Sequence, residues 1–101
     1  MSGASIREAA SGRLEIHGDL SFASVPGLWR QLAGSFSGPG VPDVDLQYVV
    51  RSDSAGLALL MECLRAARQT GSSVRFFNIP AQMLAIARAS SLDQVLPLHH
   101  D

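Results

Sequence analysis

The polar run Arg51-Ser52-Asp53-Ser54 is the part of the chain whose residue types and spacing best suit a chemical role. It leads directly into a segment with the apolar spacing of a helix. The first N–H groups of a helix lack backbone partners, and the Ser54 hydroxyl can accept a hydrogen bond from one of them. The Asp53 carboxylate would lie at the positive end of the helix dipole. Because Ala55 and Gly56 are small, a partner could approach the backbone of the first turn closely.

Two interpretations of this run follow from the residues. In the structural one, Ser54 is only a helix cap that contributes about 1 kcal/mol. In the functional one, the start of the helix is a polar contact surface, and Arg51 pairs with a partner carboxylate at its rim. On the same helix, Ala58, Glu62 and Arg65 lie opposite the apolar stripe. That face is either solvated or an extension of the contact.

Residues elsewhere in the sequence do not suggest a catalytic or metal site. There is no glycine-rich phosphate loop ending in Lys-Ser or Lys-Thr. The histidines are His17, in an expected strand, and the pair His99-His100 near the end, which is too few ligands at suitable spacing for a metal. Cys63 falls inside an apolar helical segment and is expected to be a core residue. We therefore expect no catalytic residues, no metal and no cofactor.

The elements that must position these residues alternate along the chain. Alternating or continuous apolar runs predict strands at 13–17, 43–50 and 74–79. Helical spacing predicts a helix that begins after Ser21 or Ser24 and ends at Gly34, a second one from the polar run to about Gly71, and a third that opens at Pro80. This β-α-β-α-β-α order predicts a sheet with parallel strands. In the first helix, Trp29 is either a core residue or a partner contact.

Composition excludes several classes of protein. A chain of 101 residues forms one domain. With 47% apolar and 17% charged residues it is not a disordered segment. A net charge of −1 gives no electrostatic support for nucleic-acid binding. The longest apolar run, from Ala55 to Met61, is too short to span a membrane, residues 1–10 contain no apolar signal segment, and the single cysteine suits a reducing compartment. We expect a cytoplasmic domain.

Three motifs in order resemble the STAS domain family (sulfate transporter and anti-sigma factor antagonist). They are Gly18-Asp19-Leu20, Val44-Asp45-Leu46-Gln47-Tyr48-Val49 and Asp53-Ser54-Ala55-Gly56-Leu57, and the match runs from residue 12 to 96. The resemblance implies an α/β fold with a four- to five-stranded mixed sheet and helices mainly on one face. It also implies a single domain over 12–97, with 1–11 and 98–101 as flexible or edge segments. Ser52 stands where the family usually has an apolar residue, which suggests added polar surface beside the site.

Within this family the chain is similar to the single-domain subunits of phospholipid-transport ABC complexes. The likeness rests on its length, on Leu28-Trp29, on Arg51, on the run from Gly56 to Leu60 and on the ending from Leu92 to Pro97. It implies a non-enzymatic subunit, peripheral to the inner membrane without inserting into it, that binds the cytosolic ATPase and, through it, the permease. The contact surface would comprise Arg51, Ser52, Asp53, Ser54, Ala55, Gly56, Ala58, Glu62 and Arg65. The alternative is an anti-sigma-factor antagonist, in which the resemblance makes Ser54 the phosphoacceptor of a partner kinase.

Overall fold

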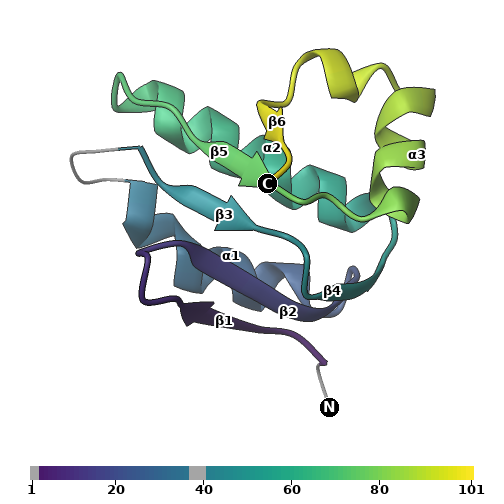
Figure 1. Cartoon of the computed structure of the whole chain (residues 1–101), viewed down its shortest axis with the longest axis horizontal. Helices are drawn as coiled ribbons and strands as arrows, with labels where there is room; N and C mark the ends of the chain where they lie inside the picture. The colour runs from purple at the N-terminus through teal and green to yellow at the C-terminus, as the bar shows by residue number, and fades with distance from the viewer. Residues whose placement is uncertain (1–2, 37–40) are drawn as a thin grey trace.

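The chain folds into a mixed sheet with its first two helices packed behind it (Figure 1). The computed structural model describes residues 3–36 and 41–101. The strands are β1 (Ser5–Glu8), β2 (Leu14–Leu20), β3 (Asp43–Asp45), β4 (Val49–Ser52), β5 (Arg75–Phe77) and β6 (Leu98–His99). The helices are α1 (Val25–Leu32), α2 (Ser54–Gln69) and α3 (Ala81–Ala89), with short 3-10 turns η1 (Ala33–Phe36) and η2 (Leu92–Gln94).

The sheet has the order β1-β2-β3-β5-β6, and β4 pairs with β2. Strand β1 is antiparallel to β2, whereas the other pairs are parallel. Strands β3 and β4 pair with successive parts of β2, so the sheet is five positions wide. The expected fold class is confirmed: an α/β domain with a mixed sheet and helices mainly on one face.

The expectation of one continuous strand over 43–50 is wrong, because this part of the chain forms two separate strands, β3 and β4. The chain turns between β3 and β4, where the Val49 N–H donates to the Leu46 carbonyl at 3.1 Å. The cause is Asp45, whose side chain accepts a hydrogen bond from the Gln47 N–H at 3.0 Å. Such a local bond offers the backbone an alternative to the sheet ladder. The break lets β3 pair with β5 while β4 leaves β5 and continues along β2.

Both ends of the described chain add strands at the edges of the sheet. Residues 5–8, expected to be a frayed lead or an edge strand, form β1, while residues 1–2 lie outside the described part. The segment after Pro97, interpreted from the sequence as a tail, contains β6, which pairs with β5. It is held by backbone hydrogen bonds from the Phe76 N–H to the Pro97 carbonyl and from the Asn78 N–H to the His99 carbonyl.

The core lies between the sheet and the helices. Ile16, Val44 and Phe76, from neighbouring strands, are fully buried, and Leu57 and Leu60 of α2 pack in the same cluster. This is the apolar stripe that the helical spacing predicted. No described helix packs on the opposite face of the sheet (Figure 1). Every second side chain of each strand points to that face.

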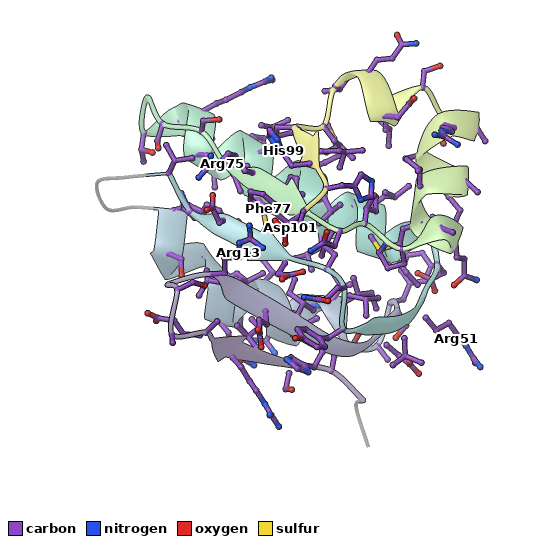
Figure 2. All side chains as sticks on the ribbon, viewed as in Figure 1. Arg13, Arg51, Arg75, Phe77, His99 and Asp101 are labelled. Atoms are coloured by element: carbon purple, nitrogen blue, oxygen red, sulfur yellow. The ribbon has the colours of Figure 1, made fainter. Side chains whose placement is uncertain are left out.

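The helix-free face of the sheet is covered by paired charges around an aromatic ring. The Arg75 side chain donates to Asp43 at 2.7 and 2.9 Å, and the Arg13 guanidinium carbon lies 3.8 Å from the centre of the Phe77 ring. His99 stacks on the same ring, at 5.3 Å between centroids. Figure 2 shows this cluster over the middle strands, whereas Arg51 stands apart at the edge of the molecule.

Candidate protein-interaction site

The start of α2 is capped by Asp53, so the prediction that Ser54 provides the cap is wrong. Asp53 has an extended backbone, and its Oδ1 accepts a hydrogen bond from the Ala55 N–H at 2.8 Å. Ser54 is already the first residue of the helix. Its side chain is exposed and makes no hydrogen bond with any residue that the structure describes. The hydroxyl is therefore available to a partner or to a modifying enzyme.

The predicted contact residues divide into an exposed and a buried set. Exposed are Arg51, Asp53, Ser54, Ala58 and Arg65, and Glu62 is half-buried. Buried are Ser52, Ala55 and Gly56. The expectation that small residues in the first turn let a partner reach the backbone is therefore wrong, because Ala55 and Gly56 are buried within the domain. A contact through this helix would involve the exposed set.

Gly56 and Ser52 pack against each other under the helix start. A Cβ atom added at Gly56 would lie 2.0 Å from the Ser52 Oγ and 3.2 Å from the Leu20 side chain. Ser52 is only 3% exposed, and its hydroxyl donates to the Asp53 carbonyl at 2.9 Å. Ser52 therefore adds no polar surface, contrary to the expectation from the sequence. Its role here is to satisfy the backbone while α2 approaches β2 closely.

A pocket of about 300 Å³ opens beside the helix start, at the carboxyl ends of β2 and β4. Its walls are formed by Asp19, Leu20, Ser21, Arg51, Ser52, Asp53 and Gln82. Gln82 comes from α3, and its side-chain oxygen accepts a hydrogen bond from the Ser52 N–H at 3.3 Å. Sequence reasoning missed Gln82, which lies 30 positions from Ser52 and belongs to no motif. Asp19 and Leu20 belonged to a recognised motif, but spacing did not reveal that they line this pocket.

Within the part of the chain that the structure describes, the charged side chains around the pocket form no ion pair with one another. Among the described residues, the ion pairs do not include Asp19, Asp53 or Arg51. Arg51 points outward from the edge of the molecule (Figure 2). Further along α2, Arg65 pairs with Glu62 at 2.7 Å. The helix start thus presents both signs of charge, which suits a specific polar contact with another protein.

The structure also places two other residues that the sequence analysis singled out, Trp29 and Cys63. Trp29 is half-buried at the edge of the core and stacks on Phe36, with 6.2 Å between ring centroids. Cys63 is fully buried, and burial raises the pKa of its thiol to about 12. A thiol in this state is not an effective nucleophile.

Residues 3–36 and 41–101 contain no cluster of three metal-ligating side chains of the His, Cys, Asp or Glu type. In the same ranges, every helix is too short or too polar to cross a membrane. Another concave surface is an open groove of about 550 Å³ along the second half of α2, lined by Met61, Glu62, Leu64, Arg65, Arg68 and Gln69. It adjoins the exposed face on which Glu62 and Arg65 lie.

Solved structures share this fold at low sequence identity. The anti-sigma factor antagonist SpoIIAA in its unphosphorylated form matches with a TM-score of 0.75 and 12% identity, over 97% of this chain and 87% of that one. One chain of the Acinetobacter MlaFEDB complex in an ATP-bound conformation matches with a TM-score of 0.75 and 23% identity, over 94% and 99%. One chain of the complex between the diguanylate cyclase SiaD and its activator SiaC, from Pseudomonas aeruginosa, matches with a TM-score of 0.61 and 19% identity, over 98% and 91%.

At these identities the solved structures establish the fold alone. No curated protein matches the chain in sequence. The family model described as the MlaB STAS domain, however, matches residues 5–98, which is nearly the whole chain. The chain therefore belongs to the MlaB-type family of STAS domains.

Proposed function

We propose that this protein is a non-enzymatic subunit that binds the cytosolic ATPase of a Mla-type phospholipid-transport ABC complex. Through that contact it supports the assembly and activity of the complex, which maintains outer-membrane lipid asymmetry. The protein is then cytoplasmic and held at the inner membrane through the ATPase and the permease. The observation that carries the proposal is membership of the MlaB-type family over residues 5–98. The likeness to a chain of the MlaFEDB complex supports it.

The proposed contact surface is the exposed start of α2 together with the pocket beside it. Asp53 and Ser54 present a carboxylate and a free hydroxyl, and Arg51 extends from the adjacent strand end. A contact of this kind can favour one conformation of the ATPase, by as much as its affinity for the two conformations differs. Ala58 and Arg65 lie on the exposed face of the same helix and would extend the contact.

The direct test is binding of the purified Mla-type ATPase from the same organism. Ser54→Asp places a second carboxylate beside Asp53 and is expected to weaken binding at least tenfold, about 1.4 kcal/mol. The matched control is Ser73→Asp, at an exposed serine beyond the other end of α2. The 16 residues of α2 give the helix a length of about 24 Å, which separates the two serines. If the unmodified chain does not bind the ATPase, the proposed function is wrong. If Ser54→Asp binds like the control, the contact lies elsewhere.

A second function, a phosphorylation switch, is favoured by one observation. The Ser54 hydroxyl is exposed and makes no hydrogen bond with the described residues, and the fold matches an anti-sigma factor antagonist solved in its unphosphorylated form. A phosphate at this helix start is tolerated by the helix itself, so its charge of about −2 would act on the partner surface. Mass measurement of the protein purified from its own cells separates the two functions. Phosphate on Ser54 supports the switch, and copurified transporter subunits support the first proposal.

A further inference from the structure

A β-bulge beside the pocket turns a large apolar side chain into solvent. In the pairing of β2 with β4, Gly18 aligns with Val49 and Asp19 with Arg51, so Val50 has no partner residue. Val49 is 6% exposed and packs in the core, while Val50 is 79% exposed. Bulges re-aim side chains and are over-represented beside functional sites. The exposure of Val50 is thus a product of the strand geometry.

A second apolar side chain is exposed on the other strand end. Phe22, in the connection from β2 to α1, is 75% exposed. The connection is fixed by the buried Ser24, whose hydroxyl donates to the Asp19 carbonyl at 2.8 Å and accepts from the Ser21 N–H at 2.9 Å. The aromatic ring is therefore displayed by an ordered turn.

These two side chains differ from the other exposed apolar residues in degree and in position. Elsewhere in the described chain, the large apolar residues that are exposed (Val41, Tyr48 and Val95) are between 42% and 49% exposed. Phe22 follows Ser21 and Val50 precedes Arg51, and both neighbours line the pocket. Partner-binding energy is concentrated in a few residues that become fully desolvated in the interface, aromatic side chains prominent among them, and burying an exposed valine adds the free energy of removing apolar surface from water. The two most exposed large apolar residues of the described chain are thus the sequence neighbours of two residues that line the polar pocket.

We propose that Phe22 and Val50 are the apolar anchors for the ATPase subunit at this site. The inference rests on the proposed function and adds a chemical description of the partner: an apolar patch that covers both side chains, with polar groups beside it that enter the pocket. Asp19, Asp53 and Arg51 line that pocket and form no ion pair with a described residue, so the partner groups that enter it should be polar and of both signs. Phe22 and Val50 would bury apolar surface against the partner, and the polar groups at the start of α2 would fix the partner's orientation.

The test is the affinity of the purified Mla-type ATPase from the same organism for single variants of the full chain. Phe22→Ser and Val50→Ser are each expected to weaken binding at least tenfold. Val95→Ser, which removes an exposed valine beyond the far end of α3, is the matched control and should bind within about twofold of the unmodified chain. Circular dichroism and thermal melting of each variant verify that the fold is unchanged.

The outcomes separate the inference from the proposed function. If the unmodified chain binds and the two variants bind equally well, Phe22 and Val50 are not anchors, while the proposed function stands. If the unmodified chain does not bind the ATPase, the proposed function fails first. The remaining candidate for the occupant of this site is a second copy of this chain, and analytical ultracentrifugation tests for that self-association. Self-association that is lost in Phe22→Ser and Val50→Ser, with ATPase binding unchanged, would overturn the inference.

Discussion

The guanidinium group of Arg13 donates two hydrogen bonds to the carboxylate of Asp101, at 2.6 and 2.8 Å, across 88 positions of the chain. Asn78 completes the link: its side-chain N–H donates to Asp101 at 3.0 Å, and its oxygen accepts from the Asp101 N–H at 3.2 Å. Asn78 has a φ of 59°, in the left-handed region that asparagine tolerates better than most residues. These bonds hold the segment after β6 across the helix-free face of the sheet.

Removing the Asp101 side chain should therefore loosen β6. In Asp101→Ala, hydrogen exchange at the Phe76 and Asn78 amides is expected to accelerate severalfold, because both donate to carbonyls of the segment from 97 to 99. Amides in β2 should be unaffected. Glu62→Gln, which removes the charge from an exposed ion pair of similar length (2.7 Å) on α2, is the control and should leave these two amides unchanged. Equal exchange in both variants would contradict a clasp at Asp101.

The same link predicts a pH dependence. Hydrogen bonds from Arg13 and then from Asn78 hold the pKa of Asp101 well below its ordinary value. A carboxyl whose pKa is lowered in the folded state stabilises the fold above its ordinary pKa, near 3.9 for aspartate, and this contribution is lost as the pH falls further. The difference in unfolding free energy between the unmodified chain and Asp101→Asn should shrink between about pH 4 and pH 2. Urea unfolding across this range measures it, and a constant difference would argue against the link.

Capping by Asp53 predicts opposite outcomes for two adjacent residues. Asp53→Ala removes the acceptor of the Ala55 N–H and is expected to lower the unfolding free energy by about 1 kcal/mol. Ser54→Ala should change it by less than about 0.5 kcal/mol, as for other surface substitutions. Chemical denaturation of both variants checks the assignment. A larger loss of unfolding free energy for Ser54→Ala than for Asp53→Ala would show that Ser54, and not Asp53, caps the helix.

Close packing under the helix start predicts a cost at Gly56. The added methyl group in Gly56→Ala would clash with the Ser52 Oγ and is expected to cost about 1–3 kcal/mol, as for overpacked cores. Gly27→Ala, inside α1 and close only to the end of an arginine side chain, is the control. It should stabilise the fold by about 0.5–1 kcal/mol, because alanine is the better helix former. Thermal unfolding distinguishes the two signs.

Burial of Cys63 predicts that its thiol is silent in the native state. The pKa near 12 leaves almost no thiolate at pH 8, and the side chain is fully buried. Reaction with a disulfide reagent at pH 8 should therefore follow unfolding and accelerate steeply with denaturant. Fast labelling of the folded protein, with a rate independent of denaturant, would show that the thiol is accessible.

Local patterns in the sequence predicted the elements better than the site. The amphipathic spacing placed α2 within about two residues of its observed ends, because the stripe of Leu57, Leu60 and Leu64 is a property of the helix itself. The break after β3 was missed because it depends on one side-chain bond of Asp45. The cap was misassigned because two adjacent polar residues were both suitable, and only the backbone conformation decides between them.

The site could not be fully predicted because distant segments form it. The α2 face was expected from the sequence, but Gln82 acts through a contact with a residue 30 positions away. No pattern in the sequence indicates that Phe22 and Val50 are exposed, since their exposure follows from a turn and a bulge. These are properties of tertiary pairing, which periodicity does not encode.

Gln82 occupies a place that a neighbouring strand fills in a continuous sheet. Where β4 has left β5, the amide of Ser52 is satisfied by this one side chain from α3. A ladder bond ties two backbones together and tolerates little variation, but a side-chain acceptor can be exchanged by a single codon. A substitution at Gln82 would therefore change the shape and polarity of this corner of the domain, while the strands around it, which are held by backbone bonds, would stay in register.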